Sequence, residues 1–201
     1  MNYNVPVAVL FTAILIGEPD YMTTFCEAMA VSPLDDMMKV YHDTEYGFPV
    51  VEDDLLFERL MLEVNQAGLS WAIVLRKRPG FRAAFHGFSV DAVAAYTDED
   101  KERLVNDAGI IRNRAKIAAA IDNARKVQVL QAEYGSFRSW IDQQQAGTVA
   151  EWVKLFRSHF RFTGYEVVNE FLMSIGRIPG AHDTNCPVNE LIVQAKKRVT
   201  T

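Results

Sequence analysis

Residues 98–130 read DEDKERLVNDAGIIRNRAKIAAAIDNARKVQVL, and this stretch decides the predicted fold. Residues 98–105 have three acidic side chains in the first turn and the spacing of a short helix. A turn with Gly109 follows, and the helical period then returns over residues 112–130. The order predicts two helices joined by a short turn, a helix-hairpin-helix.

Such a hairpin is suited to a phosphate group. A glycine lets the backbone approach the phosphate, amides at the start of the second helix bind its oxygens, and basic side chains displace counterions. Contacts of this kind position a protein on nucleic acid without reading sequence. The alternative is an ordinary pair of helices with a solvated basic face. On the first interpretation the contacts come from Gly109, Ile110, Arg112, Arg114 and Lys116.

The rest of the sequence has the same helical character. From Ser32 onward no long alternating pattern indicates strands, and helices are predicted to begin at Asp53, Val149 and Tyr165. The chain has 201 residues, 49% of them hydrophobic, which is enough for one core. The sequence therefore predicts an all-α fold with a single domain over residues 22–201.

Charge and cysteine content narrow the class of protein. The net charge is -5, so any contact with nucleic acid must come from a local basic patch. Two cysteines cannot form a disulfide framework, which favours a reducing compartment such as the cytoplasm. The apolar run Val5–Gly17 is too short to span a bilayer, and no association with a membrane is expected. We interpret residues 1–21 as a non-native or poorly ordered extension before Met22; the alternative is a strand or helix packed on the core.

Glu63 is the leading catalytic candidate. In the helix that begins at Asp53, it lies within a stripe formed by Leu56, Leu60 and Ala67. A carboxylate on an apolar face costs several kcal/mol unless it is paired, hydrogen-bonded or protonated. A structural acid is the alternative. Trp71, just downstream, offers an aromatic face for a ligand or for the core.

Two cysteines and two histidines form a possible metal site. His182 and Cys186 are four residues apart, so both can face one ion from a helical turn, and Cys26 with His42 would complete the tetrahedral set that zinc prefers. The spacing of Cys26 and His42 follows no standard finger pattern. A site closed by four protein ligands is structural, because no position remains for a catalytic water.

Taken together, these segments resemble the DNA-3-methyladenine glycosylase I family. The resemblance extends from Cys26 to Cys186. It is carried by YHDTEYGFP (41–49), EVNQAGLSW (63–71), AFHGF (84–88), DAGIIRNRAKI (107–117) and the His182/Cys186 pair.

The resemblance implies a helix-hairpin-helix enzyme of base-excision repair. Such an enzyme extrudes N3-methyladenine from alkylated double-stranded DNA and hydrolyses its N-glycosidic bond without a lyase step, so that 3-methyladenine and an abasic site are the products. It implies one structural zinc ion on Cys26, His42, His182 and Cys186. It also implies that Glu63 accepts hydrogen bonds from the base, that Trp71 stacks on it, and that Tyr41 and Tyr46 line the pocket. We expect a monomer.

Four departures from the family bear on these roles. Tyr46 stands where the family commonly has Trp. Glu166, Asn169 and Glu170 add polarity to a possible pocket wall. Residues 143–162 form a shorter segment than usual, and the spacing between Cys26 and His42 is a few residues longer than usual. The alternatives are therefore a shifted lesion preference, a module that binds lesions without cutting them and, more remotely, a catalytic metal.

Overall fold

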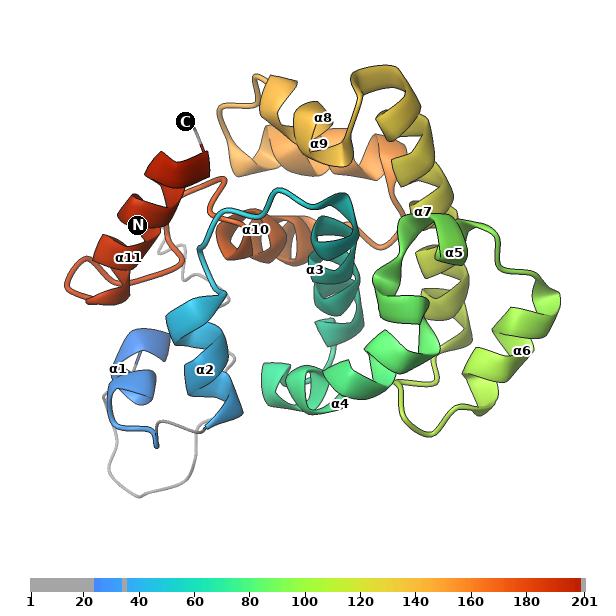
Figure 1. Ribbon diagram of the computed structural model, residues 1–201, viewed down its shortest axis with the longest axis horizontal. Coiled ribbons are helices and arrows are strands. Elements are labelled where there is room, and N and C mark those ends of the chain that lie inside the picture. Colours follow the sequence, from blue (N-terminus) through green and yellow to red (C-terminus); the bar gives the residue numbers. More distant parts are fainter. Residues whose placement is uncertain (1–23, 34–35, 200–201) are drawn as a thin grey trace, which may run out of the picture.

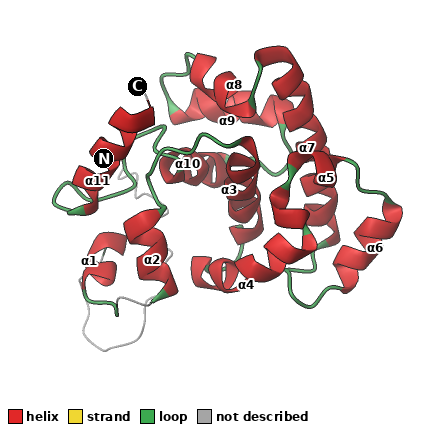
Figure 2. Ribbon diagram, viewed as in Figure 1, coloured by secondary structure: helices red, strands yellow, loops and turns green. Residues whose placement is uncertain are grey.

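The described part of the computed structural model, residues 24–33 and 36–199, contains helices and loops and no strand (Figures 1 and 2). The predicted all-α class is confirmed. The interpretation of residues 1–21 lies outside the described residues. The helices are α1 Phe25–Ala30, α2 Met37–Thr44, α3 Asp53–Gln66, α4 Trp71–Ala84, the short 3-10 helix η2 His86–Phe88, α5 Val90–Ala94, α6 Asp98–Asn106, α7 Arg114–Tyr134, α8 Phe137–Gln143, α9 Val149–His159, α10 Tyr165–Ser174 and α11 Val188–Val199.

Helix α3 is the central helix, and α4, η2, α5, α7, α8 and α10 pack against it (Figure 1). All residues from Leu56 to Asn65 are buried. The stripe that the sequence indicated is therefore part of a helix buried on every side, while Ala67 is an exposed residue just past its end. A polar side chain on α3 has to find a partner inside the protein or face a ligand.

Helices α6 and α7 form the hairpin, and their connection is held by local hydrogen bonds. The Asp107 carboxylate accepts a hydrogen bond from the Gly109 amide at 2.7 Å. Asn113 caps α7 by accepting from the Lys116 amide at 3.1 Å, so α7 begins two residues later than the predicted Arg112. Gly80 of α4 lies against this turn, where a Cβ atom would come within 2.4 Å of the Gly109 carbonyl oxygen.

The two ends of the described chain meet on one side of the molecule. Figure 1 shows α1, α2 and α11 grouped there, away from α5, α6 and α7. A small second cluster of buried side chains, Cys186, Val188 and Ile192, lies in this region with Cys26 packed against it. The residues that carry the predicted metal site are thus gathered beside the main core.

Helices long and apolar enough to cross a membrane are absent from the described ranges.

Candidate active site and metal-ligand cluster

Glu63 is buried near the end of α3, with 5% of its surface exposed. Among the described residues it has no hydrogen-bond donor. Burial raises the pKa of its carboxyl group well above the ordinary value, the charge of Glu170 raises it further, and the Arg59 guanidinium opposes both effects. A buried carboxyl group without a donor is placed to receive N–H groups from a ligand.

Three aromatic rings lie in one group near this carboxyl group. The ring of Tyr41 lies 5.2 Å from that of Trp71 and 5.7 Å from that of Tyr46. All three rings are buried, and neither the Tyr41 hydroxyl nor the Trp71 indole N–H has a partner among the described residues. The charge of Glu63 also raises the pKa of Tyr41, for which burial is the largest cause, so the two groups are close. The predicted site residues Tyr41, Tyr46, Glu63 and Trp71 are therefore brought together.

A second carboxyl group, from α10, reaches the same aromatic group. The Tyr46 hydroxyl donates a hydrogen bond to Oε2 of Glu170 at 3.0 Å, and Oε1 of Glu170 is buried without a partner among the described residues. Burial raises the pKa of Glu170. The sequence departure at Glu170 therefore falls on the wall of the site.

Ion pairs join α2, α3 and α4 beside the aromatic rings. The Glu45 carboxylate forms ion pairs with Arg59 and Arg78, and the Glu58 carboxylate forms ion pairs with Arg78 and Arg82. Arg59 also lies over the Tyr41 ring, with 5.1 Å between Cζ and the ring centroid, and its Nε and Nη1 have no described partner. Arg59 is a residue of this site that the sequence pattern did not predict. Its position four residues before Glu63 was the available signal, because such residues share a helix face.

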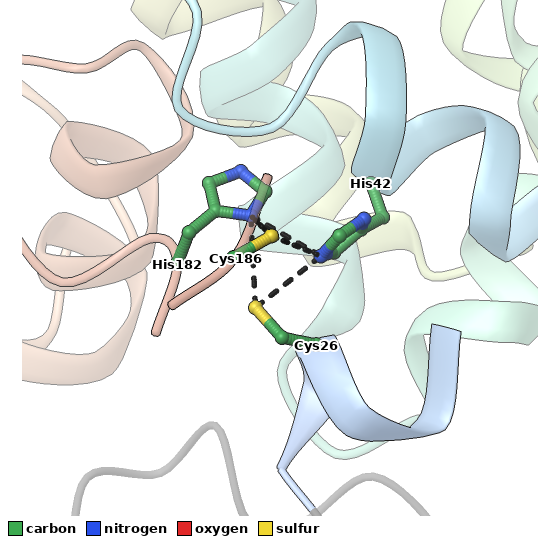
Figure 3. A group of neighbouring side chains, drawn as sticks. All are labelled: Cys26, His42, His182 and Cys186. Carbon is green, nitrogen blue, oxygen red and sulfur yellow. Dashed lines mark hydrogen bonds between the residues drawn. The ribbon is translucent and has the colours of Figure 1, made fainter. Parts of the chain in front are cut away.

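The four predicted metal ligands also converge. One ligand atom from each of Cys26, His42, His182 and Cys186 can be chosen so that all lie within 4.8 Å of one another (Figure 3). Cys26 comes from α1 and His42 from α2, while His182 and Cys186 lie in the loop before α11. The long spacing between Cys26 and His42 does not prevent this, because α1 packs against α2. The cluster is able to hold a metal ion.

The histidine tautomers point their lone pairs into this cluster. Nε2 of His182 donates to the Tyr46 carbonyl at 2.8 Å, and Nδ1 of His42 lies 2.7 Å from the Asp43 carboxylate. These acceptors require a proton on each of those nitrogens. The two remaining nitrogens, 3.1 Å apart, therefore face each other with lone pairs. A cation between them would remove that repulsion.

Without a cation, the half-buried Cys26 is held as a neutral thiol. Burial raises the pKa of the Cys26 thiol to about 12, and Cys186 adds to the rise. Burial lowers the pKa of His182, which favours the neutral imidazole that binds metals. A bound cation would favour the thiolates, and the Asp183 amide already donates to Sγ of Cys26 at 3.3 Å.

The predicted DNA contacts of the hairpin are divided by the structure. Gly109, Arg112 and Arg114 are exposed, and Arg114 forms an ion pair with Glu102 of α6. The Ile110 side chain, in contrast, is in the core, with 2% exposed, so only its backbone could reach a phosphate.

Lys116 requires a correction, because its side chain turns inward. Its ammonium group donates to the carbonyls of Asn65 and Ala67, and burial lowers its pKa. Two basic residues of α4 are also engaged within the protein: Arg78 is buried and forms ion pairs with Glu45 and Glu58, and Lys77 donates to the Ala108 carbonyl at 2.9 Å.

The arrangement near α3 suits a flat ring that carries positive charge: carboxyl groups accept its N–H groups and aromatic faces attract its charge.

The methyladenine glycosylase family profile matches residues 31–153. DNA-3-methyladenine glycosylase of Haemophilus influenzae is 31% identical over 73% of this chain and 89% of its own length. DNA-3-methyladenine glycosylase 1 of Escherichia coli is 55% identical over 45% of this chain, and the match spans 49% of that enzyme.

Solved structures give the same result. A crystal structure of 3-methyladenine DNA glycosylase I superposes with a TM-score of 0.70 at 34% identity, covering 78% of this chain and 96% of the other. The Staphylococcus aureus enzyme, solved to explain its recognition of 3-methyladenine, has a TM-score of 0.70 at 28% identity, covering 78% of this chain and 93% of its own. The chain therefore belongs to the methyladenine glycosylase family. The enzyme class predicted from the sequence, a DNA-3-methyladenine glycosylase, is confirmed by these homologues.

Proposed function

We propose that this protein is a monofunctional glycosylase of base-excision repair that removes N3-methyladenine from alkylated double-stranded DNA. One observation carries the proposal: Glu63, buried and without a donor among the described residues, lies in an aromatic group that includes Tyr41 and Trp71. A protein that only binds the DNA backbone has no use for a buried carboxyl group beside aromatic rings. The E. coli and H. influenzae relatives support the same activity.

The chemistry follows from the charge of the lesion. Methylation at N3 gives adenine a positive charge, which weakens the bond between its N9 and the sugar C1′. When the bond breaks, its electron pair stays with the base, and water adds its oxygen to C1′ and loses a proton. The role proposed for Glu63 is to accept N–H groups of the flipped base, while Trp71 stacks on its face. Flipping costs a few kcal/mol, and less for a damaged base.

We propose that zinc occupies the cluster of two cysteines and two histidines. Thiolate and imidazole ligands in a set of four are the combination that zinc prefers, and the opposed histidine lone pairs support a cation at this place. With four protein ligands the ion is structural. Its contribution is to join α1 and α2 to the loop before α11, and no step of the reaction passes through it.

The decisive experiment measures free base released from duplex DNA treated with a methylating agent, resolved by chromatography. We expect 3-methyladenine from the wild type and little from Glu63→Gln, which keeps the side-chain volume but cannot ionise. Equal release by the two proteins would remove Glu63 from the chemistry. If a folded wild type releases no base yet binds the methylated DNA, the protein is a lesion-binding module and the proposed activity is wrong.

A further inference from the structure

A second carboxyl group, outside the proposed base contacts, lies beside the same aromatic rings. Glu170 is on α10, which packs against α3, and its Oε2 accepts the Tyr46 hydroxyl at 3.0 Å. The Tyr46 ring touches that of Tyr41, which in turn touches Trp71. Glu170 is thus joined by one hydrogen bond to the group of rings near Glu63, and its charge acts on Glu63 directly.

Buried polar atoms without partners mark this place as a ligand site. Within the described residues, they include Oε1 of Glu170, the hydroxyl of Tyr41 and the indole N–H of Trp71. Leaving such groups without a hydrogen bond costs about 1–3 kcal/mol each. Glu170 therefore has one oxygen fixed by Tyr46 and a second that is available to a donor.

The charges near the pocket give Glu170 a distinct role. The Arg59 guanidinium lies over Tyr41 and lowers the pKa of Glu63, so its positive charge acts within the site. In the ion-pair network beside the site, three arginines (Arg59, Arg78 and Arg82) face two carboxylates (Glu45 and Glu58), which leaves one positive charge for Glu63 to offset. A second carboxylate gives the pocket the negative charge that attracts a cationic ring and penalises a neutral one.

We propose that Glu170 is a specificity-determining residue of the base pocket, whose carboxylate selects positively charged N-alkylated purines over neutral purines. Tyr46 is its positioning residue, because its hydroxyl holds Oε2. The inference rests on the proposed glycosylase function and extends it to the lesion class, which is defined by charge and by N–H donors.

The test compares two free bases that differ in charge. The 3,9-dimethyladeninium ion is permanently charged and mimics the lesion attached through N9, whereas 3-methyladenine is neutral at pH 8. Calorimetry at that pH gives both dissociation constants, and their ratio is the preference for the cation. Glu170→Gln should lower this preference on the order of tenfold. Tyr46→Phe should lower it less, because the carboxylate remains but loses its hydrogen bond.

A matched control separates a local contact from overall charge. Glu133→Gln removes the same charge from an exposed position near the end of α7, and we expect the preference to change less than twofold. An unchanged preference in Glu170→Gln, or an equal fall in Glu133→Gln, would overturn the proposal. Melting temperatures show whether each variant folds. If Glu170→Gln does not fold, Tyr46→Phe tests the same contact.

Base release by the wild type distinguishes a failure of this proposal from a failure of the proposed glycosylase function. If the wild type releases 3-methyladenine and Glu170→Gln keeps the wild-type preference, only the role of Glu170 is wrong. If the wild type releases no base and binds neither probe, the proposed function and the role of Glu170 both fail.

Discussion

The ammonium group of Lys116 donates a hydrogen bond to the main-chain carbonyl of Ala67 at 2.8 Å, and so joins the start of α7 to the end of α3. Asn65 contributes a second carbonyl at 3.1 Å. Carbonyls at the end of a helix have no partner within the helix and carry partial negative charge, so a lysine is a favourable cap. A residue of the hairpin therefore fixes the segment that leads to Trp71.

Lys116→Met should destabilise the protein by about 2 kcal/mol, because two carbonyls lose their donor while the aliphatic packing is kept. Urea unfolding followed by circular dichroism measures the change. A free energy of unfolding equal to that of the wild type would show that the contact contributes nothing.

Arg112→Met should act on DNA binding and leave stability unchanged, because Arg112 is exposed at the turn before α7. On the hairpin hypothesis, the variant loses one phosphate contact, so the slope of log affinity against log salt should fall by about one. Fluorescence anisotropy with a duplex that contains an abasic site, at several salt concentrations, measures the slope. Lys116→Met is the matched control and should keep the wild-type slope; the reverse result would restore Lys116 to the DNA interface.

Glu63→Gln should be more stable than the wild type at neutral pH. Burial raises the folded-state pKa of Glu63 above the value of 4.5 that an unburied glutamate has. The folded state therefore binds the proton more tightly than the unfolded state, and the wild type loses stability as the pH rises through that window. Glutamine does not titrate. Thermal melts should show the advantage of the variant at pH 7.5 and its disappearance at pH 4, and an advantage independent of pH would contradict this.

Removal of the metal should unfold the region around α1, α2 and α11, and we expect the loss of activity to follow from that unfolding. We expect elemental analysis to find one zinc ion per chain, and a strong chelator to lower the melting temperature together with the activity. His42→Ala should reproduce both effects, whereas His159→Ala removes a histidine outside the cluster and should retain the ion. Activity lost on chelation with the melting temperature unchanged would make the metal catalytic.

The sequence predicts those parts of the site that depend on spacing along one helix or on chemical type. Glu63 is predicted because it interrupts apolar positions, and the four residues of the cysteine and histidine cluster are predicted because they include both cysteines of the chain. The inward turn of Lys116 is not available from the sequence, since periodicity does not show that the end of another helix lies within its reach. The Tyr46 and Glu170 contact is likewise a product of packing between segments far apart in the chain. The position of Arg59 at the site is not predicted, because in a helix buried on all sides no polar face distinguishes a surface arginine from one that faces a site.

The convergence of the cysteine and histidine side chains has a consequence for the order of folding. Cys26 and His42 are 16 residues apart, but His42 and His182 are separated by 140 residues and Cys26 and His182 by 156. Closing loops of that length is entropically costly, so we expect the cluster to form only after packing of the core has brought its two halves together. A chain without the bound ion would then keep its core and lose the link between its two ends. The nearest pocket residue is Tyr46, whose carbonyl receives the N–H of His182 and whose hydroxyl holds Glu170. A shortage of the metal in the cell would therefore first change the lesion preference of the enzyme.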